Sequence, residues 1–207
     1  MKIHNKKNIC CRHCKNITDF KFVDLGSSPP SNEYLSEECC DKSEIYYPLQ
    51  VYVCNKCWLV QTKDFSSGSD LFKEDYAYLS STSSSWLEHC KKYVSQIVKT
   101  LNLDESSFVV ELASKDGYLL NFFKDYKVPC IGIEPTEGTA KIAQKNGIET
   151  LIEFFGYKTA ENVKKSFKKA DLIIGNNVYA HVPDINDFTK GIKSLLSDEG
   201  SLTLEFP

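Results

Sequence analysis

The sequence predicts an α/β chain in which a Rossmann-like parallel sheet, with helices on both faces, follows a small cysteine-rich α+β module. From Phe108 onward, apolar segments of strand length alternate with amphipathic segments of helix length, a pattern typical of parallel sheets. The apolar run Phe108–Leu112 leads into a short turn of small and polar residues and then a helix start. Two C-x-x-C pairs lie within the first 60 residues and define the separate module.

The elements of the predicted sheet follow from this alternation. Strands are expected near residues 108–112, 129–133, 148–152, 171–175 and 200–205, and helices near 117–126, 136–146, 158–168 and 184–196. Short loops and right-handed crossovers then give the strand order 3-2-1-4-5. Apolar residues at helical spacing also predict a helix over 86–103 that packs on this domain.

The first module is predicted to contain a strand over 20–26 and a hairpin formed by 47–53 and 58–62. The second cysteine pair would lie at the tip of this hairpin. We therefore expect three parts: a cysteine module over 1–65, a serine- and tyrosine-rich segment with a connecting helix over 66–103, and the sheet domain over 104–207.

Composition excludes several classes of protein. The 207 residues are 42% hydrophobic and 26% charged, which suffices for one full domain and one small one. The net charge of −3 argues against a broad nucleic-acid surface, so a zinc-ribbon nucleic-acid protein is a distant alternative. The basic N-terminus leads into no apolar signal region, and no run has the length of a membrane span. A cytoplasmic protein is expected.

The nine cysteines indicate a metal site rather than disulfides, because no export signal is seen. Cys11 with Cys14, and Cys54 with Cys57, can each place two thiolates on one ion, and four thiolates satisfy tetrahedral zinc. Cys10 could replace Cys11, but only Cys11 gives the two-residue spacer. The adjacent pair 39–40 is the rival second pair and is poorly suited to chelation. Such a site would be structural, since four thiolates leave no open position.

The segment after Phe108 is typical of a nucleotide-cofactor loop, in which exposed amides at a helix start meet the ligand. Glu134 ends the next strand, where an acidic residue often binds a ribose diol. NAD or FAD would require G-x-G-x-x-G, which the turn lacks. Glu111, before the turn, suits a cationic amino-acid moiety better than a phosphate, which favours S-adenosylmethionine. The alternative is an ordinary βαβ unit without a ligand.

Together with the run Asp171–Asp184, these features resemble the sugar C-methyltransferases that act on nucleotide-linked 4-keto deoxysugars. The resemblance covers nearly the whole chain and rests on four strings: Tyr47-Pro48-Leu49, Cys54-x-x-Cys57-x-Leu59-Val60-Gln61, Gly132-Ile133-Glu134-Pro135 and Leu204-Glu205-Phe206-Pro207. It implies an S-adenosylmethionine-dependent enzyme with a class I methyltransferase sheet, which methylates carbon 3 of the sugar, and an N-terminal zinc module.

The resemblance also implies roles for individual residues. Zinc would be held by Cys11, Cys14, Cys54 and Cys57. The cofactor would be bound by Glu111, the turn residues Ala113, Ser114, Lys115 and Gly117, and further along the chain Glu134, Phe155, Asn176 and Asn177. Tyr76 and His181 match polar residues that face the sugar and would assist catalysis. Each has a structural alternative: packing for Tyr76 and Phe155, a satisfied core histidine for His181, and a turn cap for the asparagine pair.

Two departures from the family pattern stand out. The family turn normally has glycine where Ala113 stands and asparagine where Lys115 stands. The family's C-terminal tyrosine and histidine-glutamate-histidine segment is expected to lie beyond Pro207, which makes a non-catalytic remnant that binds only zinc and cofactor the alternative function. The strand over 201–206 would then be an open edge, which predicts self-association.

Overall fold

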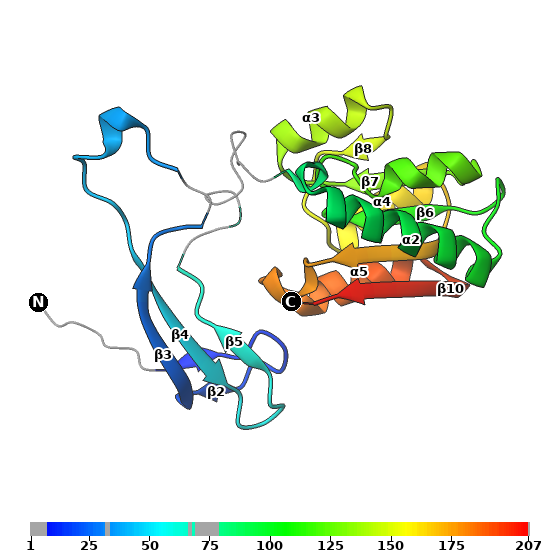
Figure 1. Cartoon of the computed structure of the whole chain (residues 1–207). Helices are drawn as coiled ribbons and strands as arrows, with labels where there is room; N and C mark the ends of the chain where they lie inside the picture. Colours follow the sequence, from blue (N-terminus) through cyan, green and yellow to red (C-terminus); the bar gives the residue numbers. More distant parts are fainter. Residues whose placement is uncertain (1–7, 32–33, 66–67, 69–78, 207) are drawn as a thin grey trace, which may run out of the picture. The chain divides into compact units, whose positions relative to one another are not determined.

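The computed structural model describes residues 8–31, 34–65, 68 and 79–206, and these form two compact units. One unit comprises residues 1–71 with 183–186, and the other comprises 72–182 with 187–207. Each is considered separately below (Figure 1). Within the described ranges, no helix combines the length and the apolar character needed to cross a membrane.

The first unit is built from two small antiparallel sheets. Strands β1 (Ile9–Cys10) and β2 (Ile17–Thr18) form one of them, and β3 (Lys21–Ser28), β4 (Tyr47–Val53) and β5 (Val60–Thr62) form the other in that order. A short 3₁₀ helix, Glu37–Cys39, lies in the connection between β3 and β4. The predicted hairpin is thus β4–β5, with the second cysteine pair in its turn.

The second unit contains a five-stranded, fully parallel sheet. Its strands are β6 (Val109–Leu112), β7 (Cys130–Ile133), β8 (Thr150–Leu151), β9 (Ala170–Asn176) and β10 (Leu196–Glu205). The spatial order β8-β7-β6-β9-β10 is the predicted 3-2-1-4-5. Figure 1 shows β10, in red, at one edge of the sheet and β8 at the other. Self-association through the β10 edge stays a prediction.

Helices cover both faces of this sheet and close two separate apolar cores. On one face, α2 (Ser84–Leu101), the 3₁₀ helix Leu120–Tyr126 and α3 (Glu137–Lys145) contribute to a core that includes Val94, Phe123 and Leu172. On the other face, α4 (Tyr157–Ser166) and α5 (Ile185–Leu195) pack through residues such as Val163 and Leu195. Burial of strands on both faces is what a parallel sheet requires.

The helix predicted over 117–126 begins later and is a 3₁₀ helix from Leu120. The reason lies in the preceding loop, where Ala113, Lys115 and Gly117 all have left-handed backbone conformations, with φ of 55°, 52° and 75°. Three such residues within five positions cannot continue a right-handed helix. The chain therefore stays irregular between β6 and Leu120, which leaves the backbone amides of the turn outside any helical hydrogen-bond ladder.

Candidate functional site

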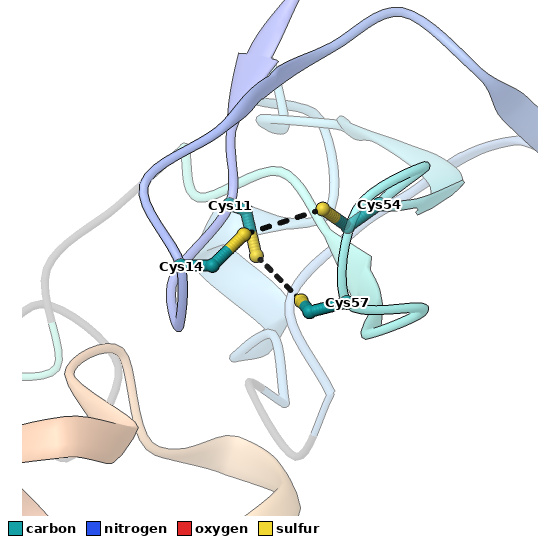
Figure 2. Close-up of side chains that lie close together, drawn as sticks. All are labelled: Cys11, Cys14, Cys54 and Cys57. Carbon is teal, nitrogen blue, oxygen red and sulfur yellow. Dashed lines mark hydrogen bonds between the residues drawn. The ribbon is translucent and has the colours of Figure 1, made fainter.

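The structure brings together the four cysteines predicted as zinc ligands. Cys11 and Cys14 lie in the turn between β1 and β2, and Cys54 and Cys57 lie in the turn between β4 and β5 (Figure 2). All four Sγ atoms lie within 4.8 Å of one another, and the Cys11–Cys57 and Cys14–Cys54 pairs are each 3.5 Å apart. Tetrahedral zinc with Zn–S bonds of about 2.3 Å places its sulfur atoms about 3.8 Å apart. The cluster therefore fits one zinc ion.

The two turns that carry these cysteines have the same backbone geometry. The Lys15 amide donates to the Cys11 carbonyl at 3.0 Å, and the Trp58 amide donates to the Cys54 carbonyl at 2.9 Å. Lys15 and Trp58 are both left-handed, with φ of 59° and 64°. Each C-x-x-C pair is thereby closed into a tight loop with both thiols on the same side, as chelation requires.

Backbone amides also prepare the second pair for metal binding. The pKa of the Cys54 thiol is lowered to about 6, first by the Cys57 amide and also by the Lys56 amide, which lies 3.4 Å from the sulfur. Amide donors that stabilise the thiolate are the usual partners of metal-bound sulfur. By contrast, Cys10 is exposed and its thiol points to the Lys15 carbonyl, outside the cluster.

The loop between β6 and the following 3₁₀ helix is held by contacts across the carboxyl ends of β6 and β7. Glu134, directly after β7, is buried, and its two carboxylate oxygens accept from the Lys115 amide at 2.9 Å and the Thr136 amide at 2.8 Å. Each oxygen keeps a lone pair for a further donor. A ribose diol supplies two hydroxyl donors, so Glu134 fits the role that the sequence predicts for it.

Close packing on β7 fixes the position of Ser114 in this loop. A Cβ atom on Gly132 would lie 2.2 Å from the Ser114 hydroxyl and 2.8 Å from its Cβ, so only glycine fits at this point of β7. The Ser114 amide donates to the Ile133 carbonyl, and its side chain is completely buried. The string Gly132-Ile133-Glu134 therefore supports the loop through both its glycine and its carboxylate.

Glu111 is the least satisfied polar side chain of the sheet. It is completely buried in β6, and neither carboxylate oxygen has a hydrogen-bond partner of normal geometry, although the Tyr118 hydroxyl lies near it. Burial raises the pKa of this carboxyl well above its usual range, while Lys115 lowers it and Glu134 raises it. A buried acid without a partner is unusual in a folded protein, and a cationic ligand group would satisfy it.

Three further buried side chains around the same loop carry unpaired polar atoms: Ser80 Oγ, Ser114 Oγ and Asp116 Oδ1. Asp116 uses its other oxygen to accept from the Ser81 amide, in the 3₁₀ helix Ser80–Thr82, at 3.2 Å. Sequence reasoning missed both Asp116 and Ser80. The only signal in the sequence was the position of Asp116 inside the turn. Unpaired polar atoms gathered at one strand end fit a polar small-molecule cofactor.

The other predicted site residues are dispersed. Asn176 ends β9, whereas Asn177 is left-handed and its side chain donates to Glu205 Oε1 at 3.1 Å, tying β9 to β10. Phe155 packs edge-on against Phe188 at 5.0 Å and joins the core beneath α5. His181 is exposed in the 3₁₀ helix Tyr179–His181 after β9. Tyr76 lies outside the described residues.

A parallel sheet of order 3-2-1-4-5 with a left-handed loop after its first strand is the architecture of class I methyltransferases. Two family models match this chain: a zinc binding domain over residues 11–72 and a methyltransferase domain over residues 86–207. The chain belongs to the methyltransferase domain family. It combines a zinc-binding domain with a methyltransferase domain, as the sequence predicts.

The chain is also similar to individual known proteins. The chain is 30% identical to the C-methyltransferase NovU of Streptomyces niveus over 197 residues, which cover 95% of this chain and 47% of the relative. It thus spans about half the length of that curated relative. Among solved structures, the PH0226 protein from Pyrococcus horikoshii has a TM-score of 0.50 at 16% identity, over 61% of this chain and 56% of that one. A SAM dependent methyltransferase from Archaeoglobus fulgidus has a TM-score of 0.47 at 15% identity, over 58% and 53%.

Proposed function

We propose that this chain transfers a methyl group from S-adenosylmethionine to carbon 3 of a nucleotide-linked 4-keto deoxysugar in the cytoplasm. The observation that carries a carbon acceptor is the likeness to a C-methyltransferase, which extends over both the zinc module and the sheet domain. The sugar class rests on the family strings at 47–49, 54–61, 132–135 and 204–207. Taken alone, no single string defines the substrate class, because one fold hosts many functions. The co-occurrence of the four strings favours this class.

The cofactor would be held along the carboxyl ends of β6 and β7. Glu134 would accept the two ribose hydroxyls, and Glu111 would face the cationic amino group of the methionine part. The turn 113–117 would lie against the methionine part, and Phe155 and the asparagine pair are proposed at the adenine and at the methyl group. When bound, S-adenosylmethionine supplies an electrophilic methyl group on a positively charged sulfur. Zinc would be held by the four cysteine thiolates and would stabilise the first module without entering the reaction.

The reaction needs a base, because the carbon next to the ketone must lose a proton before it can be methylated. The C–H electron pair moves toward the ketone to give an enolate, and the proton passes to the base. The new C–C bond then forms as the S–CH₃ bond breaks, its electron pair stays on sulfur, and the ketone is restored. His181, in the segment that follows β9, and Tyr76 are the proposed groups for proton transfer and for stabilising the enolate oxygen.

Binding of S-adenosylhomocysteine to the zinc-loaded chain, measured by calorimetry, tests the cofactor site. Glu134→Gln should weaken binding roughly tenfold, because it removes a charge-assisted hydrogen-bond acceptor. The matched control is Glu149→Gln, since Glu149 is exposed and precedes β8. An intact chain that does not bind S-adenosylhomocysteine would contradict the cofactor assignment.

Transfer of labelled methyl groups to thymidine diphosphate-4-keto-6-deoxyglucose tests the acceptor. The product spectrum should show a methyl group on carbon 3, and a methyl group on oxygen or nitrogen would contradict the proposal. Binding of S-adenosylhomocysteine without any turnover would favour the alternative function, a module that binds zinc and cofactor only.

A further inference from the structure

A small cavity of about 170 Å³ lies between α2 and the carboxyl ends of β9 and β10. Its wall combines α2, β9 and β10 with the residue that precedes the 3₁₀ helix Leu120–Tyr126, and it consists of His89, Cys90, Tyr93, Leu119, Asn176, Thr203, Leu204 and Glu205. All eight belong to the second unit. The volume corresponds to about five or six water molecules at ~30 Å³ each, which is the scale of a single six-membered ring with its substituents.

The cavity occupies a different part of the sheet from the proposed cofactor loop. The loop follows β6 and is supported by β7, whereas the cavity lies beside β9 and β10, on the other side of β6 in the strand order. Ligands of open α/β sheets gather at the carboxyl ends of strands. A cavity next to the cofactor loop and at the same end of the sheet is therefore placed for the second reactant of a transfer reaction.

Several polar groups of the cavity wall are held in fixed positions. The His89 ring stacks on Trp86 with a centroid distance of 5.1 Å and an interplanar angle of 17°. One carboxylate oxygen of Glu205 accepts from the side-chain amide of Asn177 at 3.1 Å, and the hydroxyls of Tyr93 and Thr203 form a 2.6 Å hydrogen bond. Groups fixed in this way bind a ligand with little further loss of side-chain entropy.

The charge around the cavity is negative. Glu205 lies in its wall, and Glu111 is close enough that both carboxylates raise the pKa of the Cys90 thiol beyond the larger effect of burial. Lys115 acts on the same thiol in the opposite direction. This environment disfavours a phosphate and favours a neutral ligand that donates hydrogen bonds, such as a hydroxylated ring.

We propose that this cavity binds the hydroxylated ring of the acceptor, with His89 and Glu205 as the side chains that recognise its hydroxyl groups. The inference rests on the proposed function and deepens it, because it places the acceptor ring on α2, β9 and β10. The diphosphate of the acceptor then lies outside the cavity, away from the two carboxylates.

The first test compares substitutions of His89 and Glu205 with a control substitution of Glu199, in the same strand as Glu205. Affinity for thymidine diphosphate-4-keto-6-deoxyglucose is measured by calorimetry in the presence of S-adenosylhomocysteine. Glu205→Gln and His89→Gln should each weaken it about tenfold, the effect of one lost hydrogen bond to a charged or oriented group. Glu199→Gln, at an exposed position of the same strand, should leave it unchanged. Affinity for S-adenosylhomocysteine alone should be unaffected in all three variants.

Two results of this test would overturn the assignment. If Glu205→Gln and His89→Gln bind the sugar nucleotide as the wild type does, the cavity does not hold the ring. If they lose affinity for S-adenosylhomocysteine instead, the cavity belongs to the cofactor site.

Amide chemical shifts provide a second test that does not depend on turnover. The sugar nucleotide should shift the amide signals of His89, Tyr93, Thr203 and Glu205, and thymidine diphosphate alone should not. Shifts confined to other residues would overturn the proposal. If the intact chain binds no keto-sugar nucleotide, the proposed function fails. A free 6-deoxyhexose at millimolar concentration then tests whether the cavity binds a hydroxylated ring: shifts of these amide signals support the proposal, and their absence overturns it.

Discussion

Replacing Gly132 with alanine tests whether β7 positions the loop that carries Ser114. The added Cβ would lie 2.2 Å from Ser114 Oγ, 2.8 Å from Ser114 Cβ and 3.3 Å from Thr150 Oγ1. Rotation of the serine hydroxyl relieves only the first of these contacts. The second joins two Cβ atoms, and restoring even a 3.0 Å separation requires the loop or the strand to move by 0.2 Å or more. An ordinary carbon–carbon contact of about 3.5 Å requires roughly 0.7 Å.

Overpacking of this kind destabilises a well-packed core by about 1–3 kcal/mol. With a urea m-value of about 2 kcal/mol/M, a loss of about 2 kcal/mol lowers the midpoint of unfolding by about 1 M. The assay is urea unfolding of the second unit, followed by calorimetric binding of S-adenosylhomocysteine, which should weaken as Ser114 is displaced. Gly175→Ala in β9 is the matched control, because its Cβ would meet only the ends of the Leu204 and Val178 side chains, at 3.0 and 3.2 Å.

A second substitution separates this contact from a general effect on β7. Ser114→Gly removes both atoms that the new Cβ would touch, so it should recover most of the stability that Gly132→Ala loses. The two changes are in direct contact, and their effects should therefore be non-additive. A Gly132→Ala variant that unfolds at the wild-type urea concentration, or a double variant whose losses simply add, would refute the packing argument.

Three other perturbations address the zinc module, the loop and the buried acid. Cys54→Ser should lower the zinc content well below one per chain and unfold the first unit, since structural zinc contributes about 10 kcal/mol or more to small modules. Cys40→Ser, at an exposed cysteine outside the cluster, should change neither zinc content nor folding, and full zinc content in Cys54→Ser by metal analysis would exclude the site. Ala113→Gly should stabilise the second unit by about 0.5–1 kcal/mol in thermal unfolding. The left-handed conformation costs alanine about 1–2 kcal/mol, and the larger conformational entropy that glycine loses on folding offsets part of the gain; a lower melting temperature would contradict this. Burial raises the folded-state pKa of Glu111, so its contribution to stability is complete below its ordinary pKa of 4.5 and is lost as the pH rises through the raised value. The ligand-free wild type should therefore lose more thermal stability than Glu111→Gln between pH 5 and 8. Parallel pH profiles of the two proteins would refute this.

The strand order and most of the elements could be predicted because they depend on local patterns. Apolar runs such as Phe108–Leu112 and the amphipathic segments between them define a parallel sheet, and the handedness of crossovers then leaves few arrangements. The start of the helix after β6 was predicted too early, because the left-handed conformation of Ala113 and Lys115 has no signal in these residue types. The family glycine and asparagine at these two positions are the residues that adopt this conformation most readily.

In the candidate site too, some residues could be located from the sequence and others could not. The cysteine pairs could be located by their spacing. The positions of Glu111 near the end of β6 and of Glu134 directly after β7 could also be predicted, whereas their contact with a cofactor stays a prediction. Phe155 could not be assigned from the sequence, since an aromatic residue after a strand is equally suited to a ligand or to a core partner. It packs edge-on against Phe188, and its contact with the adenine stays a prediction.

The cavity proposed for the acceptor illustrates the limit of sequence reasoning most clearly. His89 and Glu205 are separated by more than half of the chain and meet only because α2 packs against the edge where β10 pairs with β9. Neither residue belongs to a spacing motif, and the string that contains Glu205 was informative only as a family resemblance. The Glu205 carboxylate is oriented by a hydrogen bond from the side-chain amide of Asn177, a residue with a left-handed backbone conformation. A residue predicted to contact the cofactor thus orients a side chain of the neighbouring cavity, and under the two proposals the end of β9 would serve both reactants.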